Sequence, residues 1–514
     1  MMHPDRINKI TVNGHNVTLE GFVAVSRFGA EVDIAAVSVE RMCRSRVLVE
    51  EKLRENVPAY GINTGFGDFS KIAISNADAN RLQNNLILSH CTGMGNPYPE
   101  EVVRGMLLLR VNALCGGFSG IRPELVQTMV DMLNARVTPV VPEKGSLGAS
   151  GDLAPLSHMA LVLIGRGEAY YKGERMPGAE AMKKANLPIR SLLTKEGLAL
   201  INGTQAMTSV GALALYDAIC AVQLADVIGS MSMEALCGVM SAFEDRVQAV
   251  RPHPHQSLVA SNFRLLNSES EILENSRSVR VQDAYSLRCI PQVHGAIRGA
   301  LAHVLSVVEI EMNSVTDNPL IFAEDGAVVS GGNFHGEPLA LAFDYLGIAV
   351  SEIANISERR LERMVNVQLS DGLPAFLVVK GGVNSGFMIV QYAAASMVSE
   401  NKVYAHPASV DSIPSSANQE DHVSMGTTAA RKCRLIVENT LSVLALELFA
   451  AAQALELRKG LPSPVHKAIL EIVRGEILFY EEDREIRIDI EKANRMIRDC
   501  RILNYISEAV PTFV

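Results

Sequence analysis

The stretch "QAMTSVGALALYDAICAVQLADVIGS" (205–230) decides the fold class of this chain. From Gln205 to about Val247 there is no proline, and alanine, leucine, methionine and valine dominate. This composition predicts a long helix that is apolar nearly all round, and such a helix needs burial in a bundle. Similar helical runs are expected at 293–313, 337–370, 383–402 and 427–458. The sequence therefore predicts a mostly α-helical protein.

The first 200 residues have a mixed character. "KITVNGHNVTLEGFVAV" (9–25) predicts a short β-hairpin that turns at Asn13 and Gly14. Helical segments then alternate with glycine-rich loops, and no Pro- or Ser-rich linker or fixed-period repeat interrupts the chain. We expect an N-terminal mixed domain, 1–200, packed on a long helical bundle domain, 201–514.

The bulk composition excludes several classes of protein. Of the 514 residues, 48% are hydrophobic and 20% are charged, as in ordinary globular proteins. The net charge is −10 and no basic run occurs, so nucleic acid is not an expected partner. Charges interrupt the most apolar stretches, so no membrane span is expected, and the N-terminal sequence lacks the apolar core of a secretory signal. Eight scattered cysteines without a CxxC pair predict reduced thiols in a cytoplasmic protein.

The common catalytic motifs are absent. The sequence contains no GxxxxGK[ST] phosphate loop, no GxGxxG after a strand and no HExxH zinc motif. "GASG" (148–151) is not a GxSxG nucleophile elbow, because its second glycine comes one residue too soon. We therefore expect no metal, nucleotide or serine-hydrolase machinery.

The loop "GSLGASGDLAP" (145–155) is the remaining candidate for chemistry. Its glycines reach backbone angles that are closed to other residues, and Ala149 and Ser150 add little bulk. Attack of the Gly151 nitrogen on the Ala149 carbonyl closes a five-membered ring, and loss of two waters leaves a methylene derived from Ser150. That product is an electrophile that needs no external cofactor. Taken alone, however, the loop favours a flexible Gly/Ser turn.

The residues after this loop support the chemical interpretation. Asp152 and Pro155 are typical of a helix start, and an apolar run follows them. The loop is then expected at the positive end of a helix, which favours negative charge developing on the ring.

Six further motifs stand in order along the chain. They are "YGINTGFG" (60–67), "INGTQ" (201–205), "VQDAYSLRCIPQVHG" (281–295), "SVTDNPL" (314–320), "GGNFHGEP" (331–338) and "ANQEDHVSMG" (417–426). Together with "GSLGASGDLAPLSH" they resemble the aromatic amino acid ammonia-lyases, from about residue 50 to the C-terminus. The resemblance implies a fold of the fumarase and aspartase type. It also implies that Ala149, Ser150 and Gly151 cyclise to 4-methylideneimidazole-5-one (MIO), with no external cofactor.

The resemblance assigns roles to single residues. It implies that Tyr60 is the catalytic base, and that Arg288 binds the substrate carboxylate, which suits a planar guanidinium. Asn202 is expected to bond the ring carbonyl or the substrate carboxylate. The supporting roles fall to Tyr285 and Gln282 for orientation, Phe334 for stacking near the ring, and Asp152 and Asn318 for the shape of the loop.

Two positions bear on the substrate. "NNLILSHCTG" (84–93) places His90, and "NQED" (418–421) places Glu420, where the histidine-specific members of the family carry a histidine and an acid. A buried imidazole needs a partner for each ring nitrogen, whereas a phenyl ring leaves both protein groups unpaired. Gly336 and Ala284 depart from residues common in these members, and both are small changes. The resemblance therefore implies conversion of L-histidine to trans-urocanate and ammonia.

Other functions stay open at this point. A tyrosine or phenylalanine ammonia-lyase or 2,3-aminomutase uses the same MIO, and a tyrosine hydroxyl can bond His90 or Glu420. A non-catalytic helical scaffold is the alternative from another class, and it keeps Ser150 as ordinary serine. The resemblance further implies a homotetramer whose active sites draw on more than one subunit. The sequence itself shows only an excess of apolar helix.

Overall fold

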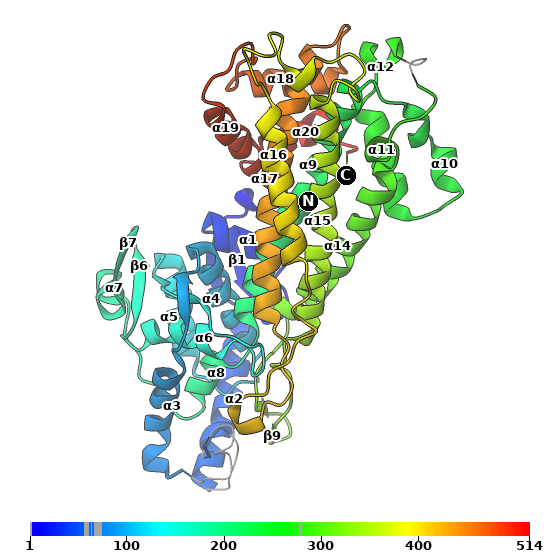
Figure 1. Cartoon of the computed structure of the whole chain (residues 1–514). Coiled ribbons are helices and arrows are strands. Elements are labelled where there is room, and N and C mark those ends of the chain that lie inside the picture. Colours follow the sequence, from blue (N-terminus) through cyan, green and yellow to red (C-terminus); the bar gives the residue numbers. More distant parts are fainter. Residues whose placement is uncertain (1–2, 56–60, 63, 66–73, 277–279, 514) are drawn as a thin grey trace. The chain divides into compact units, whose positions relative to one another are not determined.

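The computed structural model describes residues 3–55, 61–62, 64–65, 74–276 and 280–513 (Figure 1). Helices predominate, which confirms the predicted fold class. The chain forms two compact units. Unit 1 comprises Met1–Ala214, Leu305–Asp344 and Pro407–Arg431, and unit 2 comprises Leu215–Val304, Tyr345–His406 and Lys432–Val514. The division into folding domains at 1–200 and 201–514 stays a prediction, since compact units need not be folding domains.

Unit 1 holds every strand that the described residues form. The strands are β1 (Lys9–Val12), β2 (Glu31–Ile34), β3 (Met94–Pro97), β4 (Thr138–Pro139), β5 (Pro142–Lys144), β6 (Glu168–Tyr171), β7 (Glu174–Pro177), β8 (Leu320–Phe322) and β9 (Ala327–Val329). They make three two-stranded sheets, β1–β2, β3–β5 and β8–β9, and one three-stranded sheet in the order β4–β6–β7. Figure 1 shows the β6–β7 hairpin beside the short helix α7 (Gly178–Lys184).

The other helical segments of unit 1 surround these small sheets. They are η1 (Pro4–Arg6), α1 (Leu19–Val23), the π-helical turn η2 (Ala24–Phe28), α2 (Ala36–Glu55), α3 (Asn76–His90), α4 (Glu100–Cys115), α5 (Pro123–Ala135), α6 (Leu153–Leu163), α8 (Glu196–Ile201) and η6 (Ser416–Asn418). Helix α4 is buried over almost its whole length, from Val102 to Cys115, so it forms the centre of this unit.

The β-hairpin predicted at 9–25 is wrong. β1 pairs in parallel with β2 instead of folding back on the residues that follow it. The predicted turn does occur, with φ +94° at Gly14, but it leads into α1. Thr18 caps that helix, because its hydroxyl accepts a hydrogen bond from the backbone N–H three residues later. The apolar residues that follow are buried at helical rather than alternating spacing.

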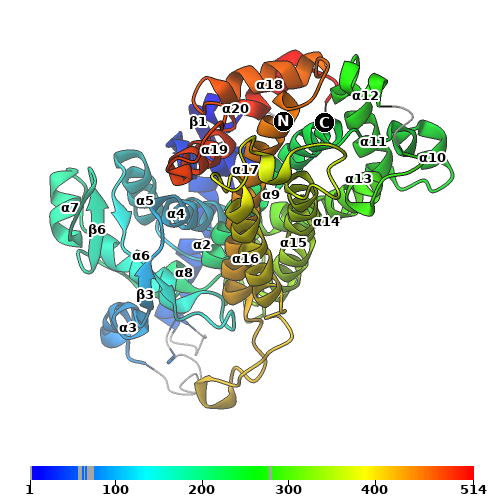
Figure 2. The same ribbon diagram turned by 45° about the horizontal axis from the view of Figure 1, so that its top comes forward.

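The regular secondary structure of unit 2 consists only of helices within its described residues. Its own segments are η4 (Met240–Phe243), α10 (Asp245–Ala249), α11 (Pro254–Leu266), α12 (Glu271–Asn275), α13 (Tyr285–Arg288), η5 (Ala375–Leu377), α16 (Met388–Tyr404), α18 (Pro464–Arg474), α19 (Ile486–Arg498) and α20 (Arg501–Ala509). The last three lie together in both views of the ribbon (Figures 1 and 2).

Four long helices begin in one unit and end in the other. They are α9 (Gln205–Ala235), α14 (Ile290–Met312), α15 (Glu337–Val365) and α17 (Gly426–Glu456), and they confirm the long helical runs predicted there. The run from 205 to 247 is not one helix, however, because α9 ends at Ala235 and two short segments, η4 and α10, follow.

These same helices correct the expectation that no segment has membrane-spanning length. By length and composition alone, all four are long and apolar enough to cross a membrane. In α9, α15 and α17, 72%, 67% and 78% of the most apolar window is buried inside the protein, against 39% in α14. Burial in the protein core therefore accounts for the apolar composition of three of them, and α14 retains an exposed apolar surface.

A buried carboxylate links three of the long helices within unit 2. Glu447 in α17 accepts hydrogen bonds from the Arg360 Nε and Nη2 atoms at 2.5 and 2.9 Å. It also accepts bonds from the hydroxyls of Ser232 at 2.7 Å and Ser357 at 2.5 Å. All four side chains are buried. These hydrogen bonds compensate the buried charge. Removal of one donor makes burial of the carboxylate more costly in free energy.

A second buried ion pair lies in unit 1. The Lys195 ammonium lies 2.9 Å from the Asp317 carboxylate, and neither side chain is exposed. Burial lowers the pKa of Lys195, and the charge and hydrogen bond of Asp317 oppose that effect. Lys195 directly precedes α8, and Asp317 follows the end of α14. The pair therefore holds together two segments that are 122 residues apart in sequence.

This pair gives a stability prediction. We expect Asp317→Ala to reduce the free energy of unfolding by about 3–5 kcal/mol, because it leaves the Lys195 charge buried without its partner. Urea unfolding followed by circular dichroism measures this change. Asp33→Ala is the matched control, since Asp33 forms a Lys–Asp pair with Lys9 at 2.6 Å on the exposed surface. That variant should unfold like the wild-type chain, and equal losses in both variants would contradict the argument.

Candidate active site

The Ala-Ser-Gly turn is held in a tight backbone conformation. Gly148 and Gly151 adopt φ angles of +67° and +71°, which side chains disfavour. The N–H of Asp152 donates a hydrogen bond of 2.7 Å to the carbonyl of Gly203. A Cβ atom on Gly151 would lie 2.1 Å from that carbonyl oxygen. The backbone at Gly151 therefore lies directly against Gly203, and only glycine fits there.

The Asp152 side chain holds the turn in place through several hydrogen bonds. Its carboxylate, which is fully buried, accepts hydrogen bonds from the hydroxyls of Ser146 at 2.8 Å and Thr427 at 2.6 Å. It also accepts the N–H of Met207 at 2.9 Å. Burial raises the pKa of Asp152, and these hydrogen bonds oppose the rise. Asp152 stands at the N-cap position of α6, as predicted, but its carboxylate does not cap that helix. It joins three chain segments instead.

The segment 423–427 covers the other side of the turn. The hydroxyl of Ser424 donates to the carbonyl of Gly148 at 3.0 Å, and the N–H of Met425 donates to the carbonyl of Leu147 at 2.9 Å. Ala149 packs with Val423 and Met425 in a small apolar cluster. The turn is thus fixed by segments that lie far from it in sequence.

A cavity of about 1230 Å³ opens onto this turn. Its described lining comes entirely from unit 1. Six of the residues predicted from the sequence line it: His90, Ala149, Ser150, Asn202, Phe334 and Glu420. Asn318, predicted to shape the loop, also lines it.

Glu420 contacts the serine of the turn. The Ser150 hydroxyl donates a hydrogen bond of 2.6 Å to Oε1 of Glu420. The Ser415 hydroxyl donates to Oε2 at 2.9 Å, so both carboxylate oxygens have a hydroxyl partner. The hydrogen bond between Ser150 and Glu420 joins two residues that are 270 positions apart in sequence.

His90 ends α3 at the edge of the cavity. Its Nδ1 atom lies 2.9 Å from the Ser89 hydroxyl. Burial lowers the pKa of His90, and the negative charge of Glu420 partly opposes the lowering. Burial thus favours the neutral ring, in which one nitrogen is a donor and the other an acceptor.

Asn202 lies beside the turn and is almost fully buried. Its side-chain amide donates to the carbonyl of Asn318 at 3.0 Å, and its backbone carbonyl accepts a 2.6 Å bond from Arg110. Within the described ranges its Oδ1 atom has no hydrogen-bond partner. Asn318 is itself fixed, because its Oδ1 accepts from Ser330 at 3.0 Å and from the N–H of Gly331 at 2.8 Å. Beside the cavity, one buried polar atom is thus left without a hydrogen-bond partner among the described residues.

Apart from Gly151 and Asp152, which belong to the turn itself, four predicted residues are not part of this cavity's described lining. Tyr60 lies outside the described residues. Gln282, Tyr285 and Arg288 belong to unit 2, where Gln282 and Arg288 line a separate cavity of about 330 Å³. Tyr285 is 70% exposed, and its ring lies 4.7 Å from the Arg288 guanidinium. Among the described atoms, the buried Nε of Arg288 has no partner.

The structure adds two histidines that the sequence did not single out. His335 and His422 both line the cavity, and their rings stack with centroids 5.5 Å apart. The Nε2 atom of His335 also lies 3.3 Å from the carbonyl oxygen of His422. Both could have been singled out from the sequence, because they lie in the motifs "GGNFHGEP" and "ANQEDHVSMG". The other polar residues of the described lining are Asn85, Ser89, Ser330, Ser415, Ser416, Gln419 and Asp421.

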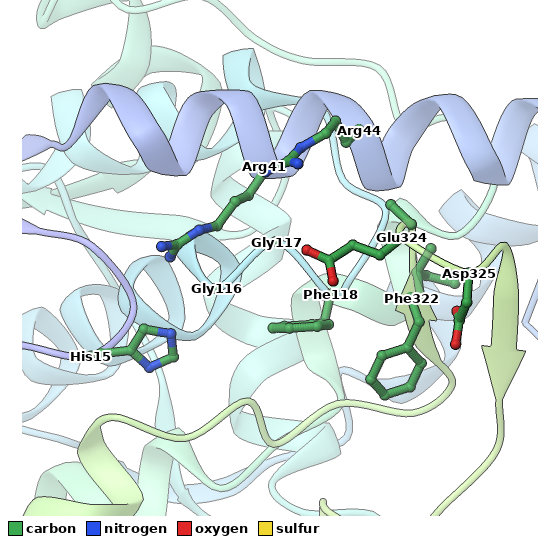
Figure 3. A pocket seen from close by; sticks show the side chains of 11 residues that line it. His15, Arg41, Arg44, Gly116, Gly117, Phe118, Phe322, Glu324 and Asp325 are labelled. Atoms are coloured by element: carbon green, nitrogen blue, oxygen red, sulfur yellow. The ribbon is translucent and has the colours of Figure 1, made fainter.

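Another cavity of unit 1, of about 340 Å³, lies between α2 and the β8–β9 turn (Figure 3). Arg41 extends from α2 across this space, and Glu324 faces it from the other side. Arg41 donates to the carbonyl of Asn13 at 3.3 Å. Side chains of both charges line it, and its described lining contains no serine, cysteine or lysine.

Unit 2 contains a serine, a histidine and a glutamate in hydrogen-bonded order. The Ser230 hydroxyl lies 2.8 Å from Nε2 of His466, and Nδ1 of His466 lies 2.5 Å from Glu234. All three side chains are fully buried, so a substrate cannot reach them. This arrangement links α9, which carries Ser230 and Glu234, to α18, which carries His466.

The fold and the cavity together define an enzyme of mostly helical architecture, built around a buried Ala-Ser-Gly turn. The family model described as aromatic amino acid lyase matches residues 17–475. The chain belongs to the aromatic amino acid lyase family.

Named relatives extend this result over almost the whole chain. A histidine ammonia-lyase of Caldanaerobacter subterraneus subsp. tengcongensis is 56% identical over 503 residues, 98% of this chain and 99% of the relative. The crystal structure of histidine ammonia-lyase from Trypanosoma cruzi matches with a TM-score of 0.91 and 42% identity, covering 98% and 96% of the two chains. Tyrosine aminomutase from Streptomyces globisporus matches with a TM-score of 0.92 and 36% identity, covering 97% and 98%.

The contact between Gly151 and Gly203 gives a second prediction. We expect Gly151→Ala to lose at least about 1–3 kcal/mol more folding free energy than Gly173→Ala. Both glycines have φ angles near +75°, at +71° and +80°, so both variants carry the same backbone penalty. Only the Gly151 variant places its Cβ against another backbone, since nothing lies within 4 Å of a Cβ at Gly173. Thermal and urea unfolding measure the difference, and equal losses would contradict the proposed close packing.

Proposed function

We propose that this chain is a histidine ammonia-lyase, which converts L-histidine to trans-urocanate and ammonia in histidine catabolism. One observation carries this proposal: His90 and Glu420 share a cavity with the Ala149–Gly151 turn. Relatives of 50–56% identity that carry the name histidine ammonia-lyase support it over nearly the full length.

We also propose that Ala149, Ser150 and Gly151 form MIO. The left-handed backbone at Gly151 and its close approach to Gly203 suit a turn that closes on itself. The unpartnered Oδ1 of Asn202 and the anchoring carboxylate of Asp152 further support a shaped site for the ring. The ring supplies an electrophilic methylene that takes up the substrate amine and makes it a better leaving group.

The chain's own residues have the remaining tasks. The reaction breaks the bond between Cα and the amine nitrogen, removes one β-proton, and leaves a carbon–carbon double bond and ammonia. We assign the removal of the β-proton to Tyr60, whose phenol must lose its own proton to act as a base. Arg288 suits the substrate carboxylate, because its buried Nε has no partner among the described atoms. Asn202 holds the ring or the carboxylate, and Phe334 packs near the substrate ring.

Recognition of the imidazole falls to His90 and Glu420. A carboxylate accepts the N–H of an imidazole, and a neutral histidine can donate to or accept from the second ring nitrogen. Burial favours the neutral form of His90, as this role requires. A phenylalanine ring cannot satisfy either group, at a cost of about 1–3 kcal/mol for each.

A tyrosine 2,3-aminomutase is the second candidate. It is favoured by the match to the Streptomyces globisporus enzyme, which is 36% identical, and by the ability of a tyrosine hydroxyl to bond His90 or Glu420. The higher identity to relatives named for histidine, 56%, favours the first candidate.

We further propose a homotetramer with shared active sites. Three assigned residues, Gln282, Tyr285 and Arg288, belong to unit 2, whereas the described lining of the cavity comes from unit 1. The cavity is larger than one small amino acid requires, so there is space for groups from another subunit. The exposed apolar surface of α14 supports contacts between copies.

We place the enzyme in the cytoplasm. None of the eight cysteines forms a disulfide bond, and three of the four long apolar helices are mostly buried in the protein. Free thiols are typical of a reducing compartment. The substrate is a free amino acid, and the net charge of −10 gives no support for nucleic acid as a partner.

The substrate proposal is tested by product formation from L-histidine, L-tyrosine and L-phenylalanine in parallel. We expect strong preference for histidine with urocanate as product. In His90→Phe, kcat/KM for histidine should fall by about 10- to 100-fold while that for phenylalanine rises, because one polar partner of the imidazole is lost. His253→Phe is the control, since His253 is exposed and does not line the cavity. Preference of the wild-type enzyme for tyrosine, or a β-amino acid product, would favour the second candidate.

Shared sites are tested by complementation. We expect chains that carry Ser150→Ala and chains that carry Arg288→Ala to be inactive alone and to regain activity when co-expressed. A site that combines unit 1 of the second chain with unit 2 of the first has no substitution. Co-expression of Ser150→Ala with Asn202→Ala is the control, because both changes fall in unit 1 and every site remains defective. Equal recovery in both mixtures, or none in either, would contradict shared sites of this composition.

A further inference from the structure

The contact between Ser150 and Glu420 exists in the chain before any ring has formed. The hydroxyl that MIO formation must expel lies 2.6 Å from a carboxylate oxygen. No other side chain of the described residues makes a hydrogen bond with that hydroxyl. A group at this distance from a leaving oxygen is in position for proton transfer.

Glu420 is held in this position by its own loop. Ser415 and Glu420 form an antiparallel bridge, in which the Ser415 N–H donates to the Glu420 carbonyl at 2.9 Å. The Ser415 hydroxyl adds a 2.9 Å bond to Oε2, which leaves Oε1 for Ser150. Backbone and side chain of Ser415 therefore fix the same carboxylate.

The loop between them is strained. Ser416, Ala417 and Asn418 have φ angles of +52°, +53° and +66°, the left-handed region that residues other than glycine rarely adopt. Three such residues in a row persist only where the surrounding structure enforces them, and such strain concentrates at functional sites. Here the left-handed loop reverses the chain, so that Glu420 lies within hydrogen-bond distance of Ser415.

We propose that Glu420 is the acid–base catalyst for dehydration of Ser150 during formation of MIO, with Ser415 as its positioning residue. This inference rests on the proposed function, because it requires that the ring forms. It gives Glu420 a task before the first substrate arrives, in addition to recognition of the substrate ring.

The atoms balance as follows. The Gly151 nitrogen bonds to the Ala149 carbonyl carbon. The former carbonyl oxygen leaves as water with the hydrogens of the Gly151 and Ser150 nitrogens, and a double bond forms between the Ala149 carbonyl carbon and the Ser150 nitrogen. The Glu420 carboxylate then takes the proton from the Ser150 Cα and gives it to the Ser150 Oγ. The Cβ–Oγ bond breaks, a second water leaves, and a Cα–Cβ double bond remains. Glu420 ends as it began, so no oxidant or other reactant is needed.

Asp152 is the nearby carboxylate that does not have this task. Its oxygens accept bonds from Ser146, Thr427 and Met207, and none of its hydrogen bonds goes to Ser150. It shapes the turn, whereas Glu420 contacts the atom that leaves. The two carboxylates therefore have separate roles, anchoring and proton transfer.

The test is the intact mass of full-length chains, followed over time after synthesis. The wild-type chain should lose two water masses. We expect Glu420→Gln to complete this loss at least about 100-fold more slowly, because the amide can neither give nor take the proton. Ser415→Ala should slow it by about tenfold, and Ser415→Thr, which keeps the hydroxyl, should restore it. This rescue separates positioning of Glu420 from a general loss of structure.

Ser416→Ala is the matched control, because it removes a hydroxyl from the neighbouring position, which makes no bond to Glu420. It should lose both waters at the wild-type rate. If Glu420→Gln does not fold, the Ser415 series still decides the matter. Loss of both waters at the wild-type rate in Glu420→Gln and Ser415→Ala would overturn this inference and leave the proposed function intact. Absence of any loss in the wild-type chain would overturn the proposed function itself.

Discussion

The site depends on one buried carboxylate. Asp152 is fully buried. The free-energy cost of burying its carboxylate is offset only while its hydrogen-bond donors remain in place. These donors come from the start of the turn, from α9 and from α17. The carboxylate thus fixes the position of three segments at once, and the Ala-Ser-Gly turn is formed between them. The position of the turn that carries Ser150 follows from this arrangement.

Two kinds of residue share the cavity. Asp152 and Gly151 act through shape, because one accepts several hydrogen bonds and the other fits where a Cβ does not. His90, Glu420 and Asn202 present polar atoms to the cavity. Only the second kind can contact a ligand. The division explains why the loss of a shaping residue is expected to reduce stability, whereas the loss of His90 is expected to change specificity.

The fold class and half of the site were available from the sequence. Long apolar runs without proline predict buried helices, and the ordered motifs brought His90, Ser150 and Glu420 into one expected site. The hairpin at 9–25 failed because helical burial after Thr18 outweighs the turn signal at Gly14. The Ser415–Glu420 bridge could not be predicted, because it depends on three left-handed residues that carry no glycine signal. The assignment of Gln282 and Arg288 to a different unit was equally invisible, since a motif does not state which part of a fold contains it.

The close contact of Gly151 with Gly203 has a consequence for the order of events in the cell. The turn obtains its shape from residues 203, 207, 424 and 427, all of which are synthesised after it. A chain still leaving the ribosome, or one that has misfolded, lacks these partners and presents residues 149–151 as ordinary flexible peptide. The reactive group proposed for this protein can therefore arise only where a cavity already encloses it. Because folding comes before ring formation, the strong electrophile is kept away from the thiols and amines of other proteins.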